Sequence, residues 1–169
     1  MIKNKSASII TISALFVAGI FMPFLLQQYH LNMLTEIIIF ALYAVSYNLL
    51  LGNAGLLSFG HAAFFGLGAF MAAVAIIHIP GLSLWNTLLI GVATTILAGF
   101  VLGGLLLRHK GSSFALLTLA FNALFYAVAT KWHSVTGGDD GLSITRPALD
   151  MGFTSIPMNS LANFYYLTL

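Results

Sequence analysis

Three polar side chains in an apolar part of the chain are the residues best placed to do chemistry. Asn53, Ser58 and His61 lie close together in the sequence, between long apolar runs. An amide, a hydroxyl and an imidazole can bind a small polar molecule or pass a proton, and in hydrocarbon they are costly unless paired or facing a cavity. We interpret them as candidates for a substrate path or gate. A hydrogen-bonded corner between helices is the structural alternative.

Motifs for catalysis and metal binding are absent from the sequence. It contains no phosphate-binding loop and no HExxH or GxSxG motif. The histidines form no pair at helical spacing: His30, His61, His78, His109 and His133. The chain also has no cysteine, which excludes disulfides and thiolate sites. We therefore predict no enzymatic activity and no metal or cofactor bound by this chain.

The composition indicates a membrane protein. Of 169 residues, 60% are hydrophobic and 6% are charged, and the mean hydropathy is +1.01, whereas soluble domains carry roughly 25% charged residues. Residues 37–107 include no Asp, Glu, Lys or Arg, which is enough for about three spans of ~20 residues. The net charge of +2 reflects few charges of either sign, so we expect lipid contact and no nucleic-acid partner.

The elements that position the polar residues are helices. We predict an all-α, polytopic transmembrane helix bundle in a single domain over residues 1–169, with about five complete spans and the start of a sixth. The expected ranges are 8–26, 34–51, 58–79, 84–107 and 113–130, then 161–169. Pro23 should kink or end the first helix. An uncleaved first helix is favoured over a signal peptide, because its apolar run is long.

Small residues predict close helix packing in lipid. The candidates are Gly60, Gly66 and Gly68 in the third helix and the GxxxG pair Gly99 and Gly103 in the fourth.

Two polar residues suit helix starts. Ser58 can be the N-cap of the third helix. Glu36 lies near the predicted start of the second helix, where the macrodipole favours a carboxylate. A coupling or substrate-facing carboxylate is the alternative role for Glu36.

A second informative segment follows the fifth helix. Gly137, Gly138, Asp139, Asp140 and Gly141 predict a tight, solvated turn on the outer face. The turn has too few oxygen ligands at defined spacing for a calcium loop. We interpret it as a structural turn that presents acids to an external partner or packs over the bundle.

The basic residues indicate a cytoplasmic N-terminus. With that orientation, four of them fall inside and two outside, in agreement with the positive-inside tendency. Those inside are Lys3, Lys5, Arg108 and Lys110, and those outside are Lys131 and Arg146.

Three ordered segments carry a family resemblance. Residues 48–69 read NLLLGNAGLLSFGHAAFFGLGA, residues 114–121 read FALLTLAF, and residues 136–142 read TGGDDGL. In order and spacing they resemble the signatures of LivM-like permeases of branched-chain amino-acid ABC importers. The resemblance covers residues 42–147, about as far as Arg146-Pro147.

The resemblance implies a multi-pass permease subunit of the bacterial inner membrane, paired with a homologous second permease. Two cytoplasmic ATPases, which use the ATP, and a periplasmic substrate-binding protein complete such importers. The family handles leucine, isoleucine and valine, and relatives take urea or short amides. Family members are about twice as long, so from the resemblance we expect the sequence to be the N-terminal half of a permease, truncated at its C-terminus. The alternative is a fragment of a proton-coupled secondary transporter or channel, with Glu36 or His61 as the proton relay.

Overall fold

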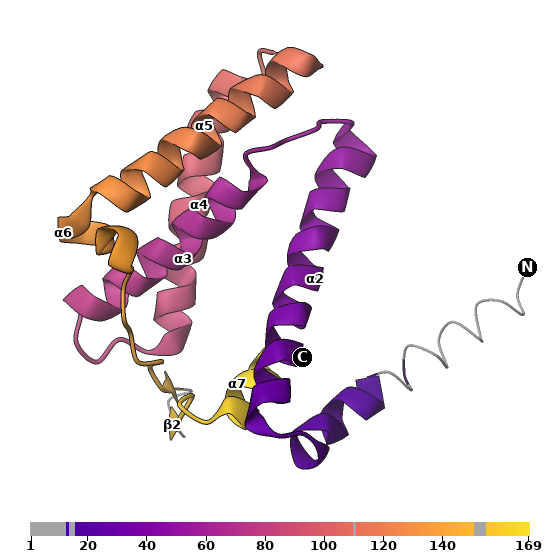
Figure 1. The fold of residues 1–169 in the computed structure, drawn as a ribbon, viewed down its shortest axis with the longest axis vertical. Helices are drawn as coiled ribbons and strands as arrows, with labels where there is room; N and C mark the ends of the chain where they lie inside the picture. The colour runs from indigo at the N-terminus through magenta and orange to yellow at the C-terminus, as the bar shows by residue number, and fades with distance from the viewer. Residues whose placement is uncertain (1–12, 14–15, 110, 151–154) are drawn as a thin grey trace, which may run out of the picture. The chain divides into compact units, whose positions relative to one another are not determined.

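The computed structural model describes residues 13, 16–109, 111–150 and 155–169. Most of them are helical (Figure 1). A short apolar helix, Phe16–Leu25, comes first. The elements that follow are α2 (Gln28–Ala54), α3 (His61–His78), α4 (Leu84–Leu106), α5 (Ser112–Lys131), α6 (His133–Thr136), η1 (Gly138–Asp140), β1 (Leu149–Asp150), β2 (Ser155–Ile156) and α7 (Leu161–Thr168). The all-α prediction is confirmed.

Four of the described helices are long and apolar enough to cross a membrane: α2, α3, α4 and α5. They correspond to the second to fifth predicted spans. The first predicted span begins outside the described residues, and its described part is the shorter helix Phe16–Leu25. The predicted sixth helix is represented by α7, which has 8 residues.

The second span begins earlier than predicted, and this changes the interpretation of Glu36. Helix α2 starts at Gln28 and has no acidic residue in its first turn. Glu36 therefore lies about two turns into the helix, at ~3.6 residues per turn, and its side chain is exposed. The macrodipole effect fades within the first turn, so the prediction that Glu36 caps this helix is wrong.

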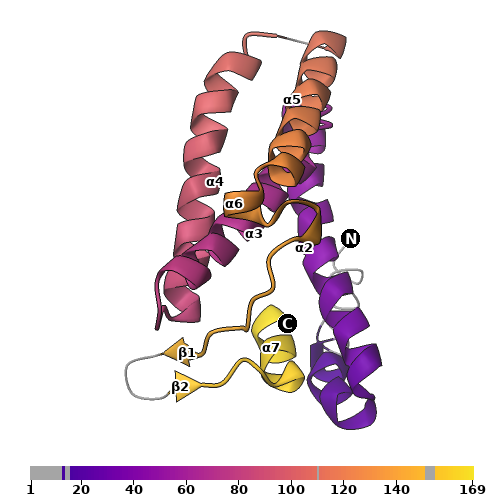
Figure 2. The same ribbon diagram turned by 60° about the vertical axis from the view of Figure 1, so that its left-hand side comes forward.

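The described residues form two compact units. One contains residues 43–156, and its centre is the contact of α3 with α4 and α5. In Figure 2, α3 lies between these two helices. The crossing of α3 and α4 is made by glycines: a Cβ on Gly68 would lie 2.8 Å from Oγ1 of Thr95, and one on Gly91 would lie 2.9 Å from the Gly68 carbonyl oxygen. Absent side chains thus let the two backbones approach closely.

The segment after α5 is tied to the start of α4 within the same unit. The Leu84 N–H donates to the Ala148 carbonyl at 3.0 Å, and the Asp150 N–H donates to Ser83 Oγ at 3.2 Å. Strands β1 and β2 then pair in an antiparallel register, with Leu149 opposite Ile156. These bonds hold the polar segment against the N-terminal end of α4.

The other unit contains residues up to 42 and residues 157–169. Here α7 packs on the helix Phe16–Leu25 through Tyr165, which is 2% exposed. The Tyr165 hydroxyl donates to the Gly19 carbonyl at 2.9 Å, and the Tyr166 hydroxyl donates to the Ile20 carbonyl at 3.0 Å. Because Pro23 has no N–H, it cannot bond the Gly19 carbonyl four residues earlier. Tyr165 supplies the missing donor.

Candidate functional site

The candidate site begins at the corner between α2 and α3. After α2, Gly55 has a φ of +64°, a conformation that favours glycine. The Ser58 hydroxyl accepts the Gly60 N–H at 3.3 Å, and Gly60 is the N-cap residue of α3, without a side-chain cap. The prediction that Ser58 is the N-cap is therefore wrong, since its hydroxyl closes the turn before the helix.

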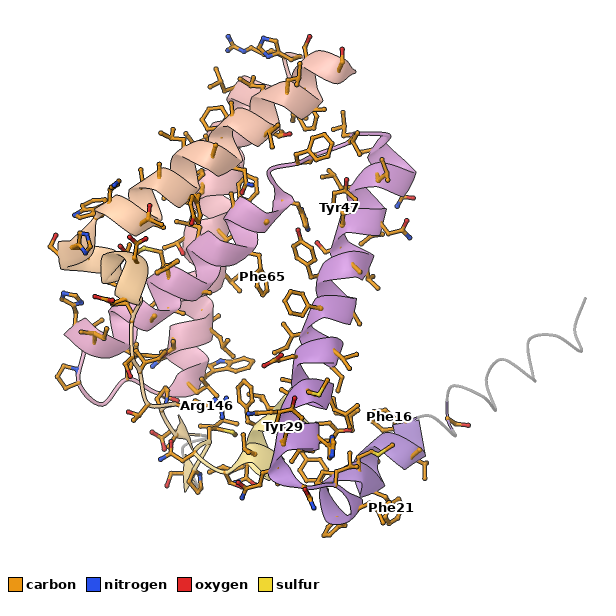
Figure 3. All side chains as sticks on the ribbon, in the orientation of Figure 1. Phe16, Phe21, Tyr29, Tyr47, Phe65 and Arg146 are labelled. Atoms are coloured by element: carbon orange, nitrogen blue, oxygen red, sulfur yellow. The ribbon has the colours of Figure 1, made fainter. Side chains whose placement is uncertain are left out.

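His61, the first residue of α3, lies in an aromatic cluster formed by Tyr43, Tyr47, His61 and Phe65. The imidazole centroid is 5.0 Å from the Tyr43 ring and 5.6 Å from the Tyr47 ring, and Tyr43 is 5.5 Å from Phe65. Tyr47 and Phe65 are labelled in Figure 3. The cluster joins the last turns of α2 to the first turns of α3, and the imidazole contacts both phenol rings.

The three polar candidates occupy different environments. Asn53 is exposed in the last turn of α2, Ser58 is 6% exposed, and His61 is half-buried. In the described part of the chain, no hydrogen bond joins any two of them. The corner therefore offers separate polar groups along one connection, and they do not form a catalytic constellation.

Thr118 on α5 fixes this corner from the other side, and the sequence did not single it out. Its hydroxyl accepts the Phe59 N–H at 3.1 Å and donates to the Ala115 carbonyl at 2.8 Å. A Cβ on Gly60 would lie 2.8 Å from the Thr118 carbonyl oxygen. Thr118 is 2% exposed. The one sequence signal was a hydroxyl residue inside the apolar segment 114–121.

The glycines predicted to pack helices differ in their surroundings. Gly60 lies against Thr118, and Gly68 lies against α4. A Cβ on Gly99 would only reach Phe64, at 4.0 Å, and those on Gly66 and Gly103 would have no described atom within 4 Å. A packing role for these last three glycines stays a prediction.

The outer turn depends on glycine at three positions. Gly137, Gly138 and Gly141 have φ values of +73°, +63° and +69°, and the His133 ring lies directly against Gly138. The Thr136 hydroxyl donates to the Ala129 carbonyl and accepts the Gly138 N–H. These bonds tie the turn to the end of α5.

The acids of this turn, Asp139 and Asp140, have exposed side chains. Across the described residues, His, Asp and Glu nowhere gather in a group of three that could hold a metal ion.

A groove of about 700 Å³ runs between α3 and α5 and ends at α6. Its lining is apolar except for a few groups, among them the Asn122 amide and Thr136. The groove starts at Ala62 and Ala63, directly after His61. The groove is formed by two helices together, and the sequence analysis did not predict it.

Comparison with known proteins gives two kinds of match. A family model described as "Branched-chain amino acid transport system / permease component" matches residues 29–169. The chain is also 31% identical, over 137 residues, to the high-affinity branched-chain amino acid transport system permease proteins LivM of Salmonella typhimurium and Escherichia coli. No solved structure matches the chain significantly.

The match covers 80% of this chain but 32% of each LivM protein. The chain thus spans about a third of the length of these curated relatives. The family model, in contrast, covers most of the chain, including the α2–α3 corner, the Thr118 segment and the outer turn. The chain therefore belongs to the family of permease components of branched-chain amino acid transport systems.

Proposed function

We propose that this chain acts as a membrane-spanning permease subunit of an ABC importer for branched-chain amino acids or related small substrates such as urea and amides. The observation that carries the proposal is the family match over residues 29–169, on a chain with four apolar helices of spanning length. The LivM relatives are named as parts of a high-affinity branched-chain amino acid transport system, which supports this substrate class.

The proposed assembly follows from this role. The chain works with a homologous second permease subunit, two cytoplasmic ATPases that use the ATP, and a periplasmic substrate-binding protein. It lies in the bacterial inner membrane with its N-terminus in the cytoplasm. The outer turn with Asp139 and Asp140 then lies on the periplasmic side, where exposed acids are available to an external partner.

The α2–α3 corner is the part proposed to move or to contact substrate. Asn53, Ser58 and His61 provide separate polar groups along the connection, and the partial positive charge at the start of α3 favours a substrate carboxylate nearby. Alternating access driven by the ATPases needs no chemical step in this chain.

The test is uptake of radiolabelled leucine in the source bacterium after deletion of the gene and after its restoration. We expect deletion to abolish high-affinity uptake, and restoration to return it. Excess unlabelled isoleucine, valine, urea or acetamide, added one at a time, identifies the substrate class by competition. Unchanged uptake of all of these compounds in the deletion strain would contradict the proposal.

A proton-coupled transporter or channel is the second candidate, and Glu36 is the observation that favours it. Its carboxyl lies two turns inside an apolar helix of spanning length, where ionisable groups commonly serve function. The two candidates differ in energy source. Import by the proposed mechanism stops when the partner ATPase is inactivated and continues when an ionophore collapses the proton gradient at constant ATP. The opposite result favours the proton-coupled alternative.

A further inference from the structure

The groove between α3 and α5 has the form of a seat for another helix. Each wall is a row of side chains that follows one face of a helix for several turns. The α3 wall advances by four residues at a time: Ala62, Gly66, Phe70 and Val74. The α5 wall advances by three or four: Leu119, Asn122, Tyr126 and Ala129. From Ala62 to Val74 the groove is ~18 Å long at ~1.5 Å per residue, so its shape is elongated along the helices.

Asn122 requires a partner that the described residues do not supply. Its amide lines the groove and is half-buried, and no described residue makes a hydrogen bond with it. Helices α3 and α5 are both of membrane-spanning length and hydropathy. Lipid tails cannot satisfy an amide in the hydrocarbon region, whereas polar side chains of neighbouring helices can. The occupant of the groove therefore carries a hydrogen-bonding side chain at the level of Asn122.

The opposite wall is shaped for close approach. A Cβ on Gly66 would have no described atom within 4 Å, whereas one on Gly68, two residues later, would collide with α4. Gly68 is thus already used in a helix crossing, and Gly66 faces unfilled space beside Ala62 and Ala63. Small residues at such a position allow the backbone of another helix to approach closely.

The lengths of the relatives bear on where such a helix would come from. Because the match covers 32% of each LivM protein, these permeases contain long segments with no counterpart in the 169 residues. We propose that the α3–α5 groove is the seat of a transmembrane helix from that remaining portion of the permease, with a side-chain amide or hydroxyl bonded to Asn122. The proposal depends on family membership and not on which substrate is carried.

The absence of cysteine from the chain makes the test direct. A single cysteine is introduced as Ala123→Cys, which lines the groove and leaves the Asn122 amide in place. A benzophenone maleimide is attached to it in membranes of cells that contain the complete importer, and cross-linked peptides are identified by mass spectrometry. Leu116→Cys is the matched control, since Leu116 is 65% exposed on the same helix and does not line the groove.

We expect the probe at residue 123 to cross-link to a membrane-spanning peptide of the permease. This peptide should correspond to the part of LivM that the match with this chain does not cover. The probe at residue 116 should not cross-link to that peptide. Adding Asn122→Ala should lower the cross-linking yield of the probe at residue 123 and leave the cross-linking of the probe at residue 116 unchanged. Cross-links at residue 123 to lipid alone, to a second copy of this chain, to the ATPase or to the binding protein would overturn the proposal, as would the absence of any cross-linked polypeptide.

Discussion

The contact of Tyr165 with the Gly19 carbonyl predicts a coupling between two residues far apart in sequence. The hydroxyl donates to this carbonyl at 2.9 Å from a side chain that is 2% exposed. Within the helix Phe16–Leu25, the usual donor to the Gly19 carbonyl would be the N–H of residue 23, and that residue is proline. Tyr165→Phe therefore leaves a part-buried carbonyl without this donor, at a cost of about 1–2 kcal/mol.

Pro23→Ala tests this explanation, because alanine restores the N–H that proline lacks. In the Pro23→Ala background the helix itself can satisfy the Gly19 carbonyl, so Tyr165→Phe should then cost less than ~1 kcal/mol. The difference between the two backgrounds is the coupling energy of a double-mutant cycle.

The assay is the free energy of unfolding in mixed micelles, measured by titration with a denaturing detergent. Tyr166→Phe is the matched control, because Tyr166 is exposed and donates to Ile20, whose helical partner Phe24 retains its N–H. We expect its cost to be smaller and independent of residue 23. Equal costs of Tyr165→Phe with and without proline, or a cost no larger than that of Tyr166→Phe, would refute the reasoning.

Three further substitutions have defined expectations. Gly91→Leu should destabilise the chain by more than ~2 kcal/mol, because its side chain would collide with the α3 backbone. Gly103→Leu is the control in the same unfolding assay, since residue 103 has open space among the described residues. Equal effects of the two substitutions would argue against the close contact of α3 with α4. Thr118→Val should cost about 1–2 kcal/mol by leaving the N–H before α3 unpaired. Thr130→Val, whose hydroxyl bonds only within α5, should cost less, and the reverse order would argue against the corner contact. His61→Ala should lower leucine uptake about fivefold, as a loss of ~1 kcal/mol would, at unchanged membrane abundance; uptake at the parent level would remove the imidazole from the path.

The sequence predicted well those features that depend on local composition. The range 84–107 was expected as a helix, and α4 runs from Leu84 to Leu106. An uncharged apolar run of this length can satisfy its backbone in lipid only as a helix, so its structure is determined by its own residues. Helix starts were less well predicted. Gln28 to Met33 belong to α2 although they include polar residues, and this extension moved Glu36 away from the helix end.

The candidate site was predicted as a set of residue types but not as an arrangement. The sequence identified the corner at Asn53, Ser58 and His61 from polar side chains in an apolar part of the chain. It did not indicate that Thr118 would bond the backbone before α3, because that contact joins residues 59 positions apart. Many hydroxyl residues in apolar helices bond their own backbone, as Thr94 does, and composition does not distinguish the two cases.

By itself, the sequence determined that the chain is a membrane protein, which segments form its long helices, and which transport family it belongs to. These properties follow from hydrophobic length, charge distribution and ordered motifs, which are local along the chain. Only the tertiary structure decided which glycines lie at a helix crossing, which donor satisfies the Gly19 carbonyl, and that Asn122 lines a groove. Each of these depends on the rotation and approach of two helices, and a helix's own residues do not specify its neighbour.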